Sequence, residues 1–519
     1  MKRLVPFALA VVMLSAIGIT AARWCFERGY TLDYSDAEAH LDIARRVLDS
    51  RTPGAEQLGA VRLPLPHVLM IPFVMRSGDA GSNQAADDAW WRNGLAGVIP
   101  SCIAFVLAGI FLFAAARRAY ASTSAAFAVA FIFALNPNML YLQSTPMTEA
   151  LFAAALAATV WAVVWFRDSQ SALAIVAAAL ASNAASLTRY EGWFAIPFIA
   201  VYLLLTAKRK WHAVLFGALA ALGPLAWLAH NQYYFGNALE FYNGPLSPLA
   251  IYRRRLANGM QPYPGDHDWR TAFRYYLAAA KLVIGLPVIS GAGGAILMFL
   301  NRATLRAVGP MLILALPPAF YIWSVHSSGT PIFIPTRWPF SWYNTRYAIA
   351  LLPWAAFASG AIVVMLSVRA RIYLALFMVA LPAVYWWSNM RVAHQPAICW
   401  KEAEVNSTAR RAWTAEAATF LAANYRSGSG IICPFGDLTG VLREARIPLR
   451  ESIHEGNAAE WMLSVSRPYL ALRAEWALAF SGDEVSTAVL RAHRYGKNYE
   501  LRKQIIVKGA AIVEIYQLR

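Results

Sequence analysis

The chain has 519 residues, 58% of them hydrophobic and only 14% charged, with a net charge of +17. Soluble domains carry about 25% charged residues and disordered chains are apolar-poor and charge-rich, so both classes are excluded. Collagen-like and coiled-coil rods are excluded too, because glycine is 31 of 519 residues and no heptad persists. The composition indicates a polytopic membrane protein, and the positions of the basic residues argue against the nucleic-acid partner that the net charge alone would suggest.

Apolar runs of about 20 residues, the length that a helix needs to cross a bilayer, recur along the first three quarters of the chain. Eleven spans are predicted near 4–23, 95–116, 124–143, 149–166, 171–188, 192–207, 212–229, 280–300, 308–325, 346–367 and 372–388. The first run also fits a cleaved signal peptide, since its start is basic and small residues lie near Ala21 and Ala22. Its length and the ten spans that follow favour a retained helix.

The charges in the short connections predict the topology. If Lys2 and Arg3 are cytoplasmic, every second connection is cytoplasmic and basic, as the positive-inside rule requires. These connections contain Arg117, Arg118, Arg167, Lys208, Arg209, Lys210, Arg302, Arg306, Arg369 and Arg371. An odd number of spans then places the C-terminus outside. We expect a multi-pass protein of a bacterial-type inner (plasma) membrane, with a cytoplasmic N-terminus and outer loops at 24–94, 230–279 and 326–345.

The first outer loop carries the clearest functional signal. Its segment 34–50 is predicted to form a helix that ends before Pro53-Gly54, and Ser35 and Glu38 have the spacing of a capping box. At 100° per residue the helix has two apolar stripes and one polar face. The stripes are Ala37, Leu41, Ala44 and Leu48 and, beside them, Asp36, His40, Ile43 and Val47, while the face expected to be solvated is Glu38, Asp42, Arg45 and Asp49. We therefore expect the helix to lie along the membrane surface with its apolar side down.

Asp36 and His40 share the side of this helix that is expected to face the membrane domain. A carboxylate there costs free energy unless it has a partner or a chemical role, so Asp36 is a candidate catalytic residue. The alternative is that Asp36 only stabilises the helix dipole and that His40 is interfacial. Glu38 is the second candidate catalytic residue, with helix capping as its competing role. His67 follows an extended double-proline step and either lines a cleft or is also interfacial.

Ionisable and polar residues gather at the predicted outer ends of later spans. They are Glu149 after Thr145-Pro146, Arg189 and Glu191 between the fifth and sixth spans, and Asn344, Arg346 and Tyr347 at the start of the tenth. Helix capping is the default role for the first group, although a helix start also suits an anion. A single arginine at such a place can simply snorkel. Two arginines with carboxylates at one level indicate an outer-leaflet pocket for a phosphate and a polar substrate.

Three arginines break the charge pattern, because Arg253, Arg254 and Arg255 fall in an outer loop. They either contact anionic lipid head groups or help to hold an anionic substrate. A nucleic acid is not expected there, because this face is outside the cell and has no nucleic-acid-binding motif.

The polar tail is predicted to be a small α/β domain outside the cytoplasm. Its strand-like runs are 430–435, 504–507 and 511–516, its helical runs are 402–425 and 483–495, and Lys508-Gly509 is predicted to be a hairpin turn. Cys399 and Cys433 are both in the tail, so a disulfide between them is permitted. Cys25 is a competing partner, and spacing does not decide between them.

These features resemble the GT-C superfamily of polytopic membrane glycosyltransferases, in particular protein O-mannosyltransferase-like enzymes and bacterial lipid A aminoarabinose transferases. The resemblance covers about residues 1–390, a membrane domain followed by the tail domain 391–519. The residues that carry it are the motif from Ser35 to His40 with Ala44-Arg45-Arg46, then Asn136-Pro137, 146–149, 189–193 and 344–347. It implies an all-α, GT-C-like membrane domain of about 11 helices that transfers a sugar from a polyprenyl-phosphate carrier with inversion on the outer, periplasmic face.

The resemblance also assigns roles to residues. The role of the base falls on Asp36, although many members have two adjacent acidic residues where Ala37 here separates Asp36 from Glu38. The residues also fit this chemistry independently of the resemblance. Displacing a phosphate needs a base for the incoming hydroxyl, which Asp36 can be, and positive charge on the departing phosphate, which Arg189 and Arg346 can supply. His40, His67, Glu149, Glu191, Asn344 and Tyr347 are expected to line the substrate pocket.

The expected partners are the polyprenyl-phosphate sugar donor, a glycan, lipid or protein acceptor, and membrane lipids, but no nucleic acid. No cysteine or histidine cluster predicts a metal. A divalent cation, Mg²⁺ or Mn²⁺, shared by Asp36 and Glu38 through oxygen ligands is the one metal considered, and their opposite helix faces argue against it. Two other functions compete: a transporter or lipid flippase, which would need polar residues near the bilayer centre, and a non-catalytic scaffold that presents the tail.

Overall fold

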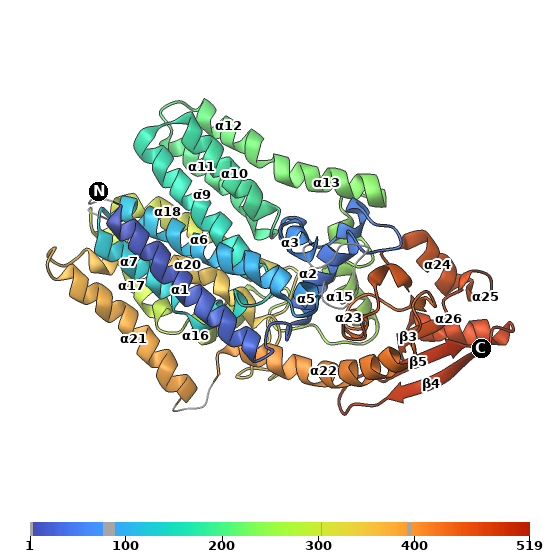
Figure 1. Cartoon of the computed structure of the whole chain (residues 1–519). Helices are drawn as coiled ribbons and strands as arrows, with labels where there is room; N and C mark the ends of the chain where they lie inside the picture. Colours follow the sequence, from blue (N-terminus) through green and yellow to red (C-terminus); the bar gives the residue numbers. More distant parts are fainter. Residues whose placement is uncertain (1–3, 76–88, 303, 392–395) are drawn as a thin grey trace. The chain divides into compact units, whose positions relative to one another are not determined.

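The computed structural model describes residues 4–75, 89–302, 304–391 and 396–519 (Figure 1). The chain forms two compact units. The helical unit comprises residues 1–30, 60–66 and 98–402, and the mixed unit comprises residues 31–59, 67–97 and 403–519. The division differs from the predicted boundary at residue 390, because most of the first loop groups with the tail. Lys2 and Arg3, on which the predicted orientation depends, lie outside the described residues, so the orientation stays a prediction.

The helical unit is built almost entirely of helices. Its elements are α1 (Val5–Glu27), α6 (Leu95–Tyr120), α7 (Thr123–Ala134), α8 (Pro137–Leu142), α9 (Glu149–Ser169), α10 (Ala172–Ser186), α11 (Glu191–Thr206), α12 (Trp211–Ala220), α13 (Leu222–Phe235), α14 (Glu240–Asn243), α15 (Pro248–Ala257), α16 (Trp269–Ile284), α17 (Pro287–Leu300), η2 (Leu305–Ala307), α18 (Val308–Leu314), α19 (Leu316–His326), η3 (Thr345–Leu351), α20 (Leu352–Val363) and α21 (Arg371–Arg391). The chain is thus a multi-pass membrane protein with an all-α membrane domain, as predicted.

The predicted count of eleven spans is only partly reproduced. Within the described ranges, seven helical segments are long and apolar enough to cross a bilayer, or eight if α16 and α17, which meet at a 111° bend, form one broken span. The predicted spans 124–143, 171–188 and 192–207 correspond to the shorter apolar helices α7, α10 and α11.

Two breaks have a local cause in the sequence. In the predicted span 124–143 the side chain of Asn136 accepts the backbone N–H groups of residues 138 and 139 at 3.0 and 3.1 Å, which caps α8 at Pro137. In the predicted span 280–300, Gly285 has a φ of +73° and Pro287 starts the next helix. A glycine in that conformation followed by a proline ends a helix.

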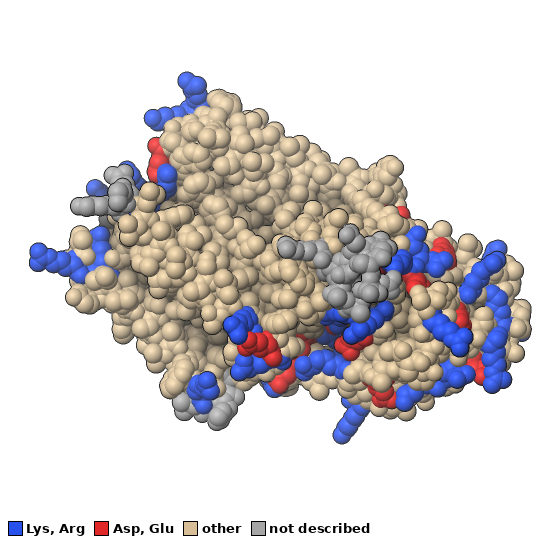
Figure 2. All heavy atoms as spheres, in the orientation of Figure 1, with Lys and Arg blue, Asp and Glu red and all other residues tan. Residues whose placement is uncertain are grey.

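The basic connections of the helical unit share one end. Arg118 lies 3.8 Å from Asp168, Arg167 donates to the carbonyl of Arg306, and the N–H of Lys208 donates to Gln170 at 2.9 Å. Four connections with predicted cytoplasmic charges therefore meet at the same side, as alternating spans require. Figure 2 shows basic side chains at this end of the helical unit and few charges over the rest of its visible surface.

The mixed unit combines helices with a five-stranded sheet. Its elements are α2 (Ser35–Arg46), η1 (Ala55–Leu58), α3 (Leu65–Met75), α5 (Ala89–Arg92), α22 (Ile398–Asn424), β1 (Ile431–Ile432), α23 (Thr439–Glu444), η4 (Leu449–Glu451), β2 (Ser452–Ile453), α24 (Ala458–Ser466), α25 (Pro468–Ala471), β3 (Trp476–Phe480), α26 (Glu484–Arg494), β4 (Tyr499–Ile505) and β5 (Val513–Leu518). The strand order is β2-β1-β3-β5-β4, with β1 parallel to both neighbours and the last two strands antiparallel. The predicted α/β tail and the hairpin at Lys508-Gly509 are confirmed, and β2 and β3 were not predicted.

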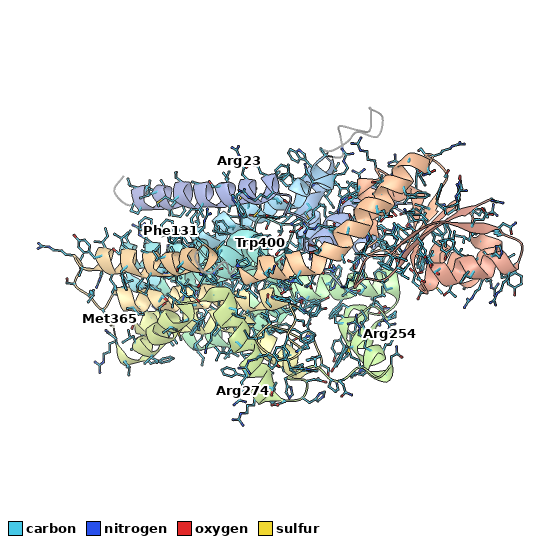
Figure 3. The ribbon with its side chains drawn as sticks, turned by 90° about the horizontal axis from the view of Figure 1, so that it is seen from below. Arg23, Phe131, Arg254, Arg274, Met365 and Trp400 are labelled. Atoms are coloured by element: carbon cyan, nitrogen blue, oxygen red, sulfur yellow. The ribbon has the colours of Figure 1, made fainter. Side chains whose placement is uncertain are left out.

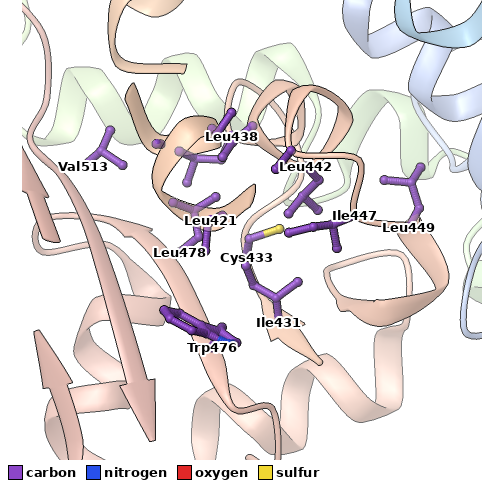
Figure 4. Close-up of a cluster of buried hydrophobic side chains, with 14 of the residues drawn as sticks. Leu421, Ile431, Cys433, Leu438, Leu442, Ile447, Leu449, Trp476, Leu478 and Val513 are labelled. Carbon is purple, nitrogen blue, oxygen red and sulfur yellow. The ribbon is translucent and has the colours of Figure 1, made fainter. Parts of the chain in front are cut away.

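The core of the mixed unit combines first-loop residues with tail residues, and Figure 4 shows tail side chains of this cluster, among them Leu442 and Cys433. One buried cluster contains Leu41 and Ala44 of α2, Met70 and Val74 of α3, and tail residues such as Leu442. Burial of such side chains stabilises a fold by about 1.5–3 kcal/mol each. The apolar stripe of α2 therefore packs into a protein core, which replaces the expected contact with the membrane surface.

The surroundings of α2 differ from the prediction on its polar side as well. The buried residues include Glu38, Asp42 and Asp49, which are 7%, 1% and 4% exposed and were expected to face water. That expectation is wrong because tail segments of the same unit cover this face. The predicted capping box is wrong too: the helix follows Tyr34 with no side-chain cap, and the carboxylate of Glu38 binds two arginines instead.

Two further expectations are corrected or left open. His67 does not follow an extended step, because Leu65 starts a helix that includes it. The exposed triplet Arg253, Arg254 and Arg255 lies on α15, where Figure 3 labels Arg254, and contact with lipid stays a prediction. Within the described chain no disulfide joins the cysteines, including Cys399 and Cys433.

Candidate active site

A small pocket, called the cavity below, lies inside the helical unit. Its polar wall comes from the start of α9, the turn before α11, the middle of α19 and η3, and consists of Glu149, Arg189, Glu191, Tyr321, Arg346 and Tyr347. Its apolar wall consists of Met139, Phe152, Ala153, Leu156, Ile349, Ala350 and Pro353. The cavity thus has a charged end and an apolar end, which suits an amphiphilic ligand.

Arg189 is the most heavily bonded group in this wall. Its Nε lies 2.7 Å from Glu191 Oε1, and its Nη1 lies 3.2 Å from Glu149 Oε1 and 2.7 Å from the hydroxyl of Thr148. Its Nη2 donates to the hydroxyl of Tyr321. These bonds fix the guanidinium and both carboxylates, so the polar end of the cavity is ordered before any ligand binds.

Arg346 faces the same carboxylate from η3. Its Nη1 lies 3.8 Å from Glu149 Oε1, beyond hydrogen-bond distance, and its guanidinium stacks 4.9 Å from the ring of Tyr347. Its Nη2 lies 3.4 Å from Oδ1 of Asn344. Arg346 is only 4% exposed. Burying a cation costs free energy, and this cost is offset only when anions lie close to it.

The position of Arg346 depends on Glu402, which lies near the start of α22 and is the last residue of the helical unit. The carboxylate of Glu402 accepts the N–H of Asn344 at 2.9 Å and, from Thr345, the N–H at 2.8 Å and the hydroxyl at 2.5 Å. Burial raises the pKa of Glu402, while Arg346 and these hydrogen bonds act in the opposite direction. Glu402 therefore anchors the residues that lead into Arg346.

The formal charges of the side chains in the polar wall of the cavity sum to zero. Glu149 and Glu191 match Arg189 and Arg346, so two acidic and two basic side chains line one cavity. Glu149 is 4% exposed, and its Oε2 has no hydrogen-bond partner among the described residues. A buried carboxylate oxygen without a donor is costly, which points to a ligand that brings a hydroxyl or another donor.

Asp36 and Glu38 belong to the mixed unit and have different surroundings. Asp36 lies in the first turn of α2 and is partly exposed. Glu38 lies between Arg410 and Arg443, with each of its oxygens 2.5 Å from one guanidinium. In the part of the chain that the structure describes, no group of three or more acidic, histidine or cysteine side chains is placed to hold a metal ion.

The two predicted pocket histidines contact each other. His40 Nδ1 lies 2.8 Å from His67 Nε2, and the side chains are 7% and 0% exposed. One ring donates and the other accepts, so both are held in place within the mixed unit. Their predicted place in a substrate pocket stays a prediction.

The sequence prediction thus found most of the polar wall of the cavity and missed Tyr321. The structure brings Glu149, Arg189, Glu191, Arg346 and Tyr347 together, as the clustering at outer helix ends predicted, and places Asn344 beside them. It also missed Glu402, which does not line the cavity but holds Asn344 and Thr345. A tyrosine inside an apolar span and an acidic residue early in the tail were the available signals.

Comparison with known proteins identifies the fold. A family model described as dolichyl-phosphate-mannose-protein mannosyltransferase matches residues 92–233, which include Glu149, Arg189 and Glu191. No curated protein matches the chain.

Solved structures match over almost the whole length. The chain is similar to ArnT from Cupriavidus metallidurans bound to undecaprenyl phosphate, with 14% identity, a TM-score of 0.56 and 97% of each chain covered. It is similar to the apo state of ArnT from the same organism, with 16% identity, a TM-score of 0.53 and 97% of each chain covered. It is also similar to the oligosaccharyltransferase AglB from Archaeoglobus fulgidus in complex with an inhibitory peptide and a dolichol-phosphate, with 13% identity, a TM-score of 0.50, and 95% of this chain and 72% of that chain covered. The chain therefore shares the fold of ArnT and AglB, the GT-C-like fold that the sequence resemblance predicted.

Proposed function

We propose that this protein is an integral-membrane glycosyltransferase that moves a sugar from a polyprenyl-phosphate donor to an acceptor hydroxyl. The observation that carries the proposal is the cavity in which two buried arginines and two glutamates adjoin an apolar wall, in a chain with the GT-C fold. The lipid phosphates bound to ArnT and AglB support the same donor class.

Each part of the cavity has a role in this proposal. Arg346 and Arg189 provide the positive charge for the donor phosphate, because guanidinium groups recognise phosphate oxygens in a fixed fork. The apolar wall holds the first prenyl units. Glu149 offers its unpartnered Oε2 to a sugar hydroxyl. Tyr347 and Tyr321 frame the guanidinium of Arg189 at 5.3 and 6.0 Å, which keeps the cation in place.

The reaction that we propose is a single displacement. Asp36 accepts the proton of the acceptor hydroxyl, whose oxygen forms a bond to the anomeric carbon of the sugar. The bond between that carbon and the phosphate oxygen breaks at the same time, and the polyprenyl phosphate leaves with the electron pair. Attack from the side opposite the phosphate inverts the anomeric centre, and the arginines stabilise the charge that develops on the leaving group.

Purified full-length protein and its Asp36→Asn variant provide the test. Both are incubated with undecaprenyl-phosphate-linked hexoses and pentoses and an envelope extract as the acceptor, and the undecaprenyl phosphate released is measured. We expect turnover in the wild type and a loss of about 100-fold or more in Asp36→Asn, because a positioned base contributes about 10²–10⁴-fold. Glu56→Gln, at an acidic residue of the same loop in η1, is the matched control and should keep full turnover.

Two results would contradict the proposal. Wild-type turnover in Asp36→Asn would reject Asp36 as the base. Movement of the donor across vesicles without any transfer would favour the transporter alternative over a transferase.

A further inference from the structure

Glu38 is the point at which the tail holds the first-loop helix α2. Its Oε2 accepts a hydrogen bond from Arg410 of α22 at 2.5 Å, and its Oε1 accepts one from Arg443 of α23 at 2.5 Å. The three side chains are 7%, 7% and 3% exposed. Both carboxylate oxygens are thus engaged, so Glu38 can take a proton from a substrate only by breaking an ion pair.

Arg410 also holds the turn that leads into α2. Its Nη2 donates to the carbonyl oxygens of Leu32 and Asp33 at 3.1 and 2.8 Å. Its neighbour Arg411 lies 3.0 Å from the carboxylate of Asp33. One segment of α22 therefore fixes both the entry to α2 and its first turn.

The C-terminal end of α2 is also held by residues of the mixed unit. Asp49, just beyond α2, accepts the N–H of Leu449 at 3.2 Å and bonds at 3.2 Å to the guanidinium of Arg450. Between the two ends, Leu41 belongs to the same buried cluster as Leu442 of α23. The helix is thus held at its start, along its length and just past its end by residues that lie about 370 to 400 positions later in the chain.

Helix geometry connects this clamp to Asp36. Asp36 precedes Glu38 by two residues, which is about 200° around the helix axis. Glu38 is directed into the buried contacts with the tail, and Asp36 correspondingly lies on another side of α2 and stays partly exposed. Any rotation or shift of α2 that changed the contacts of Glu38 would move Asp36 by a similar amount.

We propose that Glu38 is a positioning residue and that the tail, through Arg410 and Arg443, sets the position of Asp36. Catalysis then requires the tail as a structural part of the active site, although none of its residues takes part in the chemistry. This inference rests on the proposed role of Asp36 as the base. In some proteins a buried ion pair contributes mainly by fixing a single conformation.

The test compares Glu38→Gln, Arg443→Met and the double variant in the full-length protein. Two quantities are measured: hydrogen exchange of the backbone amides of residues 35–46, and kcat and KM for an undecaprenyl-phosphate-linked sugar. We expect faster exchange in α2 with unchanged exchange in α26. We expect kcat to fall by about tenfold or more with KM changed by less than about twofold, because a small displacement of a catalytic group slows the chemical step.

Controls separate this role from general destabilisation. Arg443→Lys keeps the charge and should restore part of kcat. Arg51→Gln removes the pair Arg51–Glu460, which also joins the first loop to the tail but is 37% and 39% exposed, and should change neither quantity. The losses in the two single variants should not add in the double variant, since both remove the same interaction.

Two results would overturn the inference: unchanged exchange in α2 of Glu38→Gln, or additive losses of kcat in the double variant. Failure of the proposed function is measured with a different variant, because it would appear as full turnover in Asp36→Asn.

Discussion

Glu149 and Arg189 form an ion pair of 3.2 Å in the wall of the cavity, and Glu149 also lies 3.8 Å from Arg346. One carboxylate thus sits between the two cations that we assign to the donor phosphate. An anion entering this space meets both the attraction of the arginines and the repulsion of the glutamate. The site should therefore bind a phosphate less tightly than two free arginines would.

Glu149→Gln is expected to bind undecaprenyl phosphate more tightly than the wild type. Removing one negative charge leaves the cavity with a net positive charge, and an increase of about tenfold in affinity corresponds to about 1.4 kcal/mol. Turnover should fall, because Oε2 no longer holds the sugar as a carboxylate does. Dissociation constants measured in detergent check this, with Glu240→Gln on the short helix α14 as the control. Weaker binding in Glu149→Gln would show that the glutamate orders the arginines more than it repels the phosphate.

Glu402→Gln is expected to disturb Arg346 from a distance. An amide has only one acceptor oxygen, so at least one of the N–H groups of Asn344 and Thr345, which now donate at 2.9 and 2.8 Å, would lose its partner. A buried donor without a partner costs about 1–3 kcal/mol. We expect a lower unfolding temperature and weaker binding of undecaprenyl phosphate, whereas Glu404→Gln, two residues along the same helix, should change neither. Normal binding with a lowered unfolding temperature would limit Glu402 to a structural role.

Much of the helical unit could be predicted because its signals are local. Runs of apolar residues mark most helices, and Glu149, Arg189 and Arg346 stood out because charged residues are rare in such a chain. The breaks at Asn136-Pro137 and at Gly285 were also readable, since capping and a left-handed glycine are local events. Hydropathy averaged over 20 residues conceals them, which is why eleven continuous spans were predicted.

The surroundings of α2 could not be predicted in the same way. Its periodicity correctly located one apolar stripe, but periodicity does not distinguish a polar face in water from a polar face covered by protein. The partners of Glu38 and Asp49 are Arg410, Arg443 and Arg450. Nothing in a single sequence connects residues that are separated by about 400 positions, because that pairing depends on tertiary packing.

His454 should make the mixed unit less stable in mild acid. Its ring is fully buried, its Nδ1 accepts the N–H of Gly456 at 3.0 Å, and burial lowers its pKa from 6.5 to about 3, with a further lowering by Arg46. Between these values the unfolded chain binds more protons than the folded one, so stability falls as the pH drops from about 6.5 towards 3, by at most about 1.4 kcal/mol per pH unit.

The measurement is the urea midpoint at which Cys433, buried in the core of the mixed unit, becomes reactive to a thiol label. His454→Asn keeps an acceptor near the position of Nδ1 and has no proton to gain, so its midpoint should depend less on pH below about 6.5. Parallel curves for the two proteins would contradict the assignment of this acid sensitivity to His454.

Asp42 should act in the opposite sense. It is 1% exposed, its Oδ1 accepts the indole N–H of Trp91 at 3.1 Å, and burial raises its pKa from 3.8 to about 7, with Glu38 adding to the increase and Arg443 opposing it. Between pH 3.8 and about 7 the folded chain binds more protons than the unfolded one, so stability falls as the pH rises through this window. Asp42→Asn keeps an acceptor for Trp91 and removes the titration. The variant should match the wild type near pH 4, exceed it at pH 8 by about 1 kcal/mol or more, and show this in the urea midpoint for labelling of Cys433. A variant that is less stable than the wild type at pH 8 would show that Asp42 is ionised in the folded protein and that its attraction to Arg443 outweighs the cost of burying its charge.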